Sequence, residues 1–203
     1  HDLKKVFQTK AEIYAWSAVG HGAWEVAFAN LLTPGDALLV PDTGRFAVGW
    51  AEMASALGFV VETLPTDYRR PLDPDAIEAA LRADKAHRIK AVAMVQIETS
   101  TGIVHDVAAV RKAIDAAAHP ALLLVDAVAS LGCVDLPMDA WGVDLVLTAS
   151  QKGLMMPPGL CFVAAGERGV QCGPREHART RKKQRDPRSN ASVRPASVER
   201  RAP

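Results

Sequence analysis

The stretch "LLLVDAVASLG" at residues 122–132 places one acidic residue, Asp126, directly after a continuous run of apolar residues. A second stretch, "LVLTASQKGLMMPPG" at residues 145–159, places a single lysine, Lys152, after another such run. Continuous apolar runs of this length are typical of strands that are buried on both faces of a parallel sheet. Charged side chains are rarely placed beside buried positions without a partner or a use, so Asp126 and Lys152 are candidate functional residues.

Strand and helix patterns alternate along the rest of the chain. Strands are predicted at 11–17, 37–41, 59–65, 89–97, 121–126, 144–150 and 160–165, and helices at 23–32, 45–58, 72–84 and 106–118. The third of these helices opens with Asp73 as a cap and Pro74 in its first turn. Strands alternating with helices of 10–15 residues form βαβ units. The predicted fold is therefore α/β, a three-layer αβα arrangement around a mostly parallel sheet.

Composition excludes several other classes of protein. The 203 residues are 49% hydrophobic, but no apolar run approaches the roughly 20 residues that a membrane span requires, so no membrane partner is expected. The three cysteines and six histidines lack the spacing of a disulfide framework or a metal site. We therefore predict no metal, and a reducing compartment. The chain begins at His1 rather than methionine, so we expect a fragment or a processed product.

Charge divides the sequence into two parts. Residues 168–203 carry eleven lysines and arginines against three acidic residues, although the whole chain has a formal net charge of only +1. This basic segment is rich in proline and poor in large apolar residues, so it is predicted to be a disordered tail. It could be a nucleic-acid-binding arm or an out-of-frame terminus. We favour the second explanation, so no nucleic acid partner is expected, and residues 1–167 form the predicted domain.

Four polar clusters follow predicted strands and should meet at one edge of the sheet, where α/β proteins bind ligands. They are "SAVGHGAWE" at 17–25, "ETSTG" at 98–102, Asp126, and Ser150–Lys152. Pyridoxal phosphate would use each kind of group. Lys152 could bond to its aldehyde, Asp126 could keep its ring nitrogen protonated, and the N–H groups of 20–22 could bind its phosphate. Taken singly, each has an ordinary alternative as a turn, cap or surface residue.

Together and in this order, the motifs "GHGAWE", "ETSTG", "LLLVDAVASLG" and "SQKGLMMPPG" resemble the class V aminotransferases, which are pyridoxal phosphate (PLP) enzymes of fold type I. The resemblance covers residues 1–167 and is strongest to the alanine–glyoxylate and serine–glyoxylate aminotransferases. It implies that Lys152 binds the cofactor covalently and that Asp126 pairs with the pyridinium nitrogen. It also implies that Val19, Gly20 and His21 surround the phosphate.

Four further positions are implied by the same resemblance. Gln151 would contact the phosphate side of the cofactor, Thr99 would lie near the ring oxygen, and Val128 would pack on one ring face. Phe46, in "DTGRFAVGW" at 42–50, matches the aromatic residue that stacks on the ring, although it could equally be ordinary helix core. The related cysteine desulfurases have a histidine at that position and need a suitably placed cysteine, so Phe46 argues against that activity.

The resemblance implies a transaminase that moves an amino group from serine or alanine to glyoxylate, with amino acid and 2-oxo acid substrates. It further implies a homodimer in the cytoplasm, or in the peroxisome of a eukaryote. Two departures favour an alternative. Val19 replaces the usual hydroxyl residue, and the chain lacks the C-terminal small domain whose arginine grips the substrate carboxylate. The alternative is a catalytically incompetent fragment of such an enzyme. It would consist of a truncated large domain that at most binds PLP or a partner.

Overall fold

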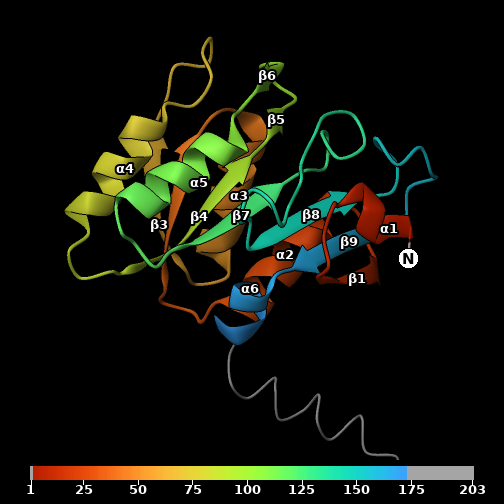
Figure 1. The fold of residues 1–203 in the computed structure, drawn as a ribbon, viewed down its shortest axis with the longest axis horizontal. Coiled ribbons are helices and arrows are strands. Elements are labelled where there is room, and N and C mark those ends of the chain that lie inside the picture. The colour runs from red at the N-terminus through yellow and green to blue at the C-terminus, as the bar shows by residue number, and fades with distance from the viewer. Residues whose placement is uncertain (1, 173–203) are drawn as a thin grey trace, which may run out of the picture. The chain divides into compact units, whose positions relative to one another are not determined.

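A seven-stranded mixed sheet forms the centre of the computed structural model, which describes residues 2–172 (Figure 1). Across the sheet the strands are β1 (Glu12–Ser17), β9 (Leu160–Ala165), β8 (Leu145–Ala149), β7 (Leu122–Asp126), β4 (Ile89–Val95), β2 (Ala37–Asp42) and β3 (Val60–Pro65). Strand β9 is antiparallel to both of its neighbours, and every other neighbouring pair is parallel. The prediction of a mostly parallel sheet is confirmed.

Helices cover both faces of this sheet, as a three-layer fold requires. Helices α2 (Gly20–Leu31) and α3 (Arg45–Ala56) contribute buried side chains to the core on one face. Helices α4 (Pro74–Ala83) and α5 (Val107–Ala116) contribute to the core on the other face, where they lie side by side (Figure 1). The short helices α1 (Asp2–Val6) and α6 (Glu167–Cys172) precede β1 and follow β9.

The continuous apolar run of β7 is explained by burial on both of its faces. Leu123 and Val125 pack with the side chains of α4 and α5, whereas Leu122 and Leu124 pack with those of α2 and α3. All four are at most 2% exposed. Burial of each such side chain contributes about 1.5–3 kcal/mol to folding, which makes the middle strands of the sheet the most strongly specified part of the chain.

The predicted Asp73 cap of α4 is confirmed, and α5 begins one residue after its predicted start. The Asp73 carboxylate accepts a hydrogen bond from the backbone N–H of Asp75, and Pro74 is the first helical residue of α4. The Asp106 carboxylate likewise accepts from the N–H of Ala109 at the start of α5. Helix α2, in contrast, begins at Gly20, three residues before the predicted start.

Three short elements were not predicted: α1, α6 and the hairpin of β5 (Ile97–Glu98) with β6 (Ile103–Val104). Helix α6 contains residues 168–172 of the predicted tail, so the described fold continues past residue 167. The remainder of that tail lies outside the described residues. Within the described chain, no helix has both the length and the apolar composition needed to cross a membrane.

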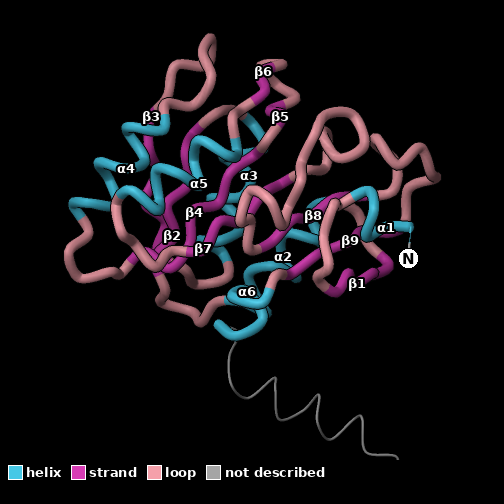
Figure 2. The backbone as a smooth tube through the Cα atoms, in the orientation of Figure 1, coloured by secondary structure: helices cyan, strands magenta, loops and turns pink. Residues whose placement is uncertain are grey.

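The direction of the strands fixes where functional loops gather. Because β1 and β8 are both antiparallel to β9, they run parallel to each other and to the rest of the sheet. The carboxyl ends of β1, β2, β4, β7 and β8 therefore meet at one edge. Figure 2 shows long loops at this edge, including the segments that follow β3, β7 and β8.

Candidate active site

A pocket of about 210 Å³ lies at the carboxyl ends of the strands. All nine residues predicted to contact a cofactor line it: Val19, Gly20, His21, Phe46, Thr99, Asp126, Val128, Gln151 and Lys152. Drug-sized ligands occupy pockets of roughly 300–1,000 Å³, so this smaller pocket suits a single ring with short substituents. The structure thus brings the predicted residues together, and their roles toward a ligand remain predictions.

Asp126 is the buried acid of this pocket, with 3% of its surface exposed. Its Oδ1 accepts a hydrogen bond from the backbone N–H of Val128 at 2.7 Å, and its Oδ2 accepts one from the indole N–H of Trp24 at 2.7 Å. Burial raises the pKa of Asp126 to about 6, because a charged carboxylate is costly away from water; the two hydrogen bonds oppose this rise. The acid is therefore held in one orientation and titrates close to neutrality.

The amino end of α2 supplies free backbone donors to the pocket. Val19 precedes the helix and offers no side-chain cap, and the first N–H with a helical acceptor belongs to Ala23. In the described chain, the N–H groups of Gly20, His21 and Gly22 have no acceptor. Unpaired donors at a helix start, together with the helix dipole, favour a bound anion such as a phosphate.

Gly20 is required here by close approach rather than by its backbone angles. A methyl group on Gly20 would lie 2.9 Å from Cγ2 of Val128, which is shorter than a normal contact. The glycine therefore allows the start of α2 to pack directly against Val128, the second residue after the buried acid. This contact places the helix donors and the carboxylate of Asp126 on the same small pocket.

Lys152 lies on the loop that follows β8. The first residue of this loop, Ser150, holds it in place through two hydrogen bonds. Ser150 is buried, its hydroxyl donates to the carbonyl of Pro157 at 2.6 Å, and its carbonyl accepts from the N–H of Met156. Gly153 lets this loop pass the turn after β7, since a methyl group there would lie 2.1 Å from the carbonyl oxygen of Leu131. The ammonium of Lys152 has no hydrogen-bond or ion-pair partner among the described residues, so it is available to a ligand.

Glu98, in the "ETSTG" segment, is a structural residue that the sequence analysis did not single out. Its side chain is fully buried, and its Oε2 accepts from the N–H groups of Phe46 and Ala47 at 3.1 and 3.2 Å. Its Oε1 accepts from the N–H and hydroxyl of Ser100 at 3.0 and 2.7 Å. Glu98 lies on β5 but caps the start of α3. It thereby holds the first turn of α3, which carries Phe46, against the turn after β5, which carries Thr99.

Replacing Glu98 with glutamine should destabilise the protein by about 1–3 kcal/mol, because the new NH₂ group would face N–H donors and leave one of them unpaired in the interior. Chemical unfolding monitored by circular dichroism measures the change. The matched control is Glu52→Gln on α3, the helix that Glu98 caps, where the carboxylate is exposed and pairs with Arg45. This control should change stability by about 0.5 kcal/mol or less. Equal effects of the two substitutions would contradict the capping role.

Trp24 is the second residue that the sequence analysis did not assign, although it stands in the quoted motif "GHGAWE". It lines the pocket, is 2% exposed and donates to Asp126 across 102 positions of sequence. A tryptophan in the first turn of a helix is ordinarily read as core, and only the folded structure shows which group its N–H meets. The one available signal was its place within a motif already linked to the pocket.

The fold and this pocket define a class of protein: an α/β ligand-binding domain with an acid at the end of strand β7 and a lysine after the adjacent strand β8. Comparison with known families then assigns it. The chain belongs to the class V aminotransferases, whose family model matches residues 1–172. The resemblance inferred from the sequence motifs is confirmed.

Individual relatives agree with this assignment. The chain is 44% identical to the serine–glyoxylate aminotransferase of Methylorubrum extorquens over 179 residues, which is 88% of this chain and 44% of the relative. It is 43% identical to the L-aspartate–glyoxylate aminotransferase of Paracoccus denitrificans over 170 residues, 83% of this chain and 43% of the relative. The crystal structure of ureidoglycine–glyoxylate aminotransferase from Bacillus subtilis superposes with a TM-score of 0.78 at 32% identity, covering 88% and 44% of the two chains. The chain therefore spans less than half the length of these relatives.

Proposed function

We propose that this chain is the cofactor-binding part of a PLP-dependent aminotransferase that transfers an amino group to glyoxylate. The observation that carries the proposal is the buried, doubly hydrogen-bonded Asp126, which lines the same pocket as the unpaired Lys152. An acid and an amine placed in this way are the two groups that PLP chemistry requires from its protein. Family membership supports the proposal, because the chain belongs to the class V aminotransferases, the family that its motifs resemble and that consists of PLP enzymes of fold type I.

The residues of the pocket fit PLP in shape and in polarity. The free N–H groups at the start of α2 suit its phosphate, and the close packing of Gly20 on Val128 brings these donors next to a residue that lines the pocket. The side-chain oxygen of Gln151 is buried without a hydrogen-bond partner in the described chain, so the pocket retains polar capacity that a ligand can use. Phe46 lines the pocket as well, in the position proposed for stacking on the ring.

When bound, PLP supplies an electron sink for the carbanion that an amino acid forms on losing its α-proton. In this proposal Nζ of Lys152 would hold the cofactor covalently until the substrate amine displaces it, and the freed amine of Lys152 would then take and return that proton as a general base. Asp126 keeps a proton on the ring nitrogen through charge pairing. Val128 and Phe46 would pack against the ring, and Thr99 and Gln151 would orient its polar edges.

For the substrates, the names of the relatives favour glyoxylate as amino acceptor. The two relatives compared above are named for different donors, serine and L-aspartate. We propose a small amino acid donor, with serine or alanine as the first choices and aspartate as a third. Assays of each donor with glyoxylate, following the matching 2-oxo acid, rank the three directly.

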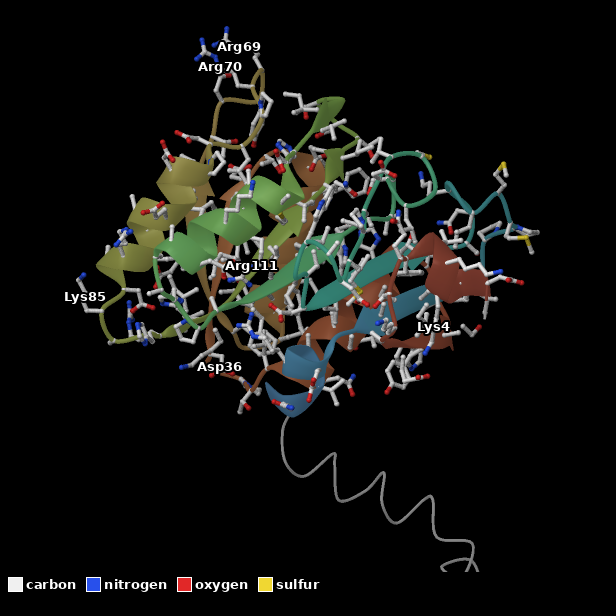
Figure 3. All side chains as sticks on the ribbon, in the orientation of Figure 1. Lys4, Asp36, Arg69, Arg70, Lys85 and Arg111 are labelled. Carbon is white, nitrogen blue, oxygen red and sulfur yellow. The ribbon has the colours of Figure 1, made fainter. Side chains whose placement is uncertain are left out.

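One observation favours a second candidate function, in which the chain binds PLP without efficient turnover. No arginine lines the pocket in the part of the chain that the structure describes. Arg69 and Arg70 lie at the tip of the loop after β3 and extend into solvent, at 89% and 82% side-chain exposure (Figure 3). Without a positioned cation for the substrate carboxylate, orientation is lost, and orientation can contribute several kcal/mol to catalysis.

Titration of the purified chain with PLP tests the proposed function. Binding should produce a visible absorbance band that borohydride bleaches, and subsequent addition of a donor to unreduced protein should convert the bound cofactor. Retention of the cofactor without conversion would select the second candidate. A chain that neither retains PLP nor shows the band would contradict both candidates.

A further inference from the structure

We propose that Trp24 is a positioning residue for Asp126: its indole N–H fixes the carboxylate and keeps it ionised so that it can hold a positively charged ring nitrogen. The inference rests on the proposed function in one respect only, which is that the ring nitrogen paired with Asp126 is that of PLP. The contact itself is a feature of the protein without ligand. Its basis is a hydrogen bond of 2.7 Å between two side chains that are 2% and 3% exposed.

Two donors fix the carboxylate from opposite oxygens. Trp24 donates to Oδ2, and the N–H of Val128 donates to Oδ1, also at 2.7 Å. Because each carboxylate oxygen can accept more than one hydrogen bond, both retain capacity for a ligand after these two bonds are made. The Val128 donor belongs to the backbone of the turn and cannot be removed by a simple substitution. Trp24 is therefore the donor of the two that a side-chain substitution can remove.

The indole is held on several sides, so it cannot easily swing away from Asp126. Its ring packs against His21 at 4.6 Å between centroids, edge-on against Trp50 at 5.7 Å, and edge-on against Phe46 at 6.4 Å. Two of these neighbours, His21 and Phe46, line the pocket themselves. The Trp24 side chain therefore contacts three parts of the pocket: His21 at the helix start proposed for the phosphate, Phe46 proposed for stacking, and the buried Asp126.

The electrostatic setting explains why Asp126 needs this donor. Burial, with a smaller contribution from the negative charge of Glu98 on β5, raises the pKa of its carboxyl to about 6. The N–H groups of Val128 and Trp24 act in the opposite direction. The other titratable groups that line the pocket are Lys152 after β8 and His21 on α2. Removing one of the two donors should leave the carboxyl largely protonated at neutral pH, when it could no longer pair with a cation.

The test is Trp24→Phe, with Trp50→Phe as a matched control. Trp50 is fully buried in the same aromatic cluster, and its indole N–H has no partner among the described residues. Both substitutions remove an indole from the core, but only the first removes a hydrogen bond to Asp126. Carbon-13 NMR of the Asp126 carboxyl in the ligand-free protein should show an upward pKa shift of roughly one to two units in Trp24→Phe, and little change in Trp50→Phe. Equal shifts, or no shift, would overturn the proposal.

Two further measurements keep the test decisive. In the wild-type protein, the indole N–H resonance of Trp24 should titrate with a midpoint near pH 6, whereas that of Trp50 should titrate much less; this needs no variant to fold. In Trp24→Phe, PLP affinity should fall about tenfold at pH 7 and recover above pH 8, as the carboxyl ionises again. If the chemical shift of the Trp24 indole N–H did not change as Asp126 titrates, the positioning role would be refuted. Failure of wild-type protein to bind PLP would instead refute the proposed function.

Discussion

Replacing Lys152 with alanine should abolish covalent retention of PLP while leaving the fold unchanged. Lys152 lies after β8, lines the pocket and uses its ammonium in no hydrogen bond or ion pair among the described residues. Its removal therefore leaves no buried group unpaired, and stability should change by about 0.5 kcal/mol or less. Without the amine, the aldehyde of the cofactor has no partner at this position, so both the visible band and the borohydride-stable adduct should disappear.

Peptide mapping by mass spectrometry after borohydride reduction measures this loss. Lys112→Ala is the matched control, because Lys112 is an exposed lysine on α5 that lines a different pocket. The control variant should form the adduct as the wild type does. Mapping of the wild-type adduct to Lys90 or Lys112 would show that Lys152 has been assigned the wrong role.

The strands and longer helices could be predicted because burial and capping leave local marks in the sequence. "ALLLV", which precedes Asp126, is apolar throughout because β7 is buried on both faces, and Asp73 and Asp106 stand where helices need acceptors. The reversed direction of β9 left no such mark, because an antiparallel strand in the middle of a sheet needs the same apolar residues as a parallel one. The two-residue strands β5 and β6 are too short to show any period.

The position of the site could be predicted from topology, but its internal support could not. Once the strands are taken as parallel, Asp126 and Lys152 must lie at the same edge, and the structure places them on one pocket. The partners of Asp126 and the acceptor of the α3 N–H groups depend on packing between distant segments. Trp24 and Glu98 therefore became visible only in the folded chain.

Replacing Asp126 with alanine should weaken PLP binding by roughly a hundredfold or more at pH 7, because the charged ring nitrogen would lose its buried partner. Equilibrium dialysis with PLP measures the affinity, and the rate of cofactor conversion by an amino donor measures the chemistry. Asp42→Ala is the matched control, since Asp42 ends strand β2, which is separated from β7 by β4, and lines a different pocket. Unchanged affinity and conversion in the Asp126 variant would make this acid a structural residue only.

The same substitution has a consequence for stability that needs no cofactor. Folding raises the pKa of Asp126 from 3.8 to about 6, so the folded state binds the proton more tightly than the unfolded state does. The resulting stabilisation is complete below pH 4 and is lost as pH rises through 6, a change of about 3 kcal/mol. Wild type should therefore lose stability relative to Asp126→Ala over this interval, as urea unfolding at several pH values would show. Over the same interval the carboxyl becomes charged, so the difference in PLP affinity between wild type and Asp126→Ala should grow while the difference in stability shrinks. If affinity and stability each changed with pH in the same way in the two proteins, both expectations would be contradicted.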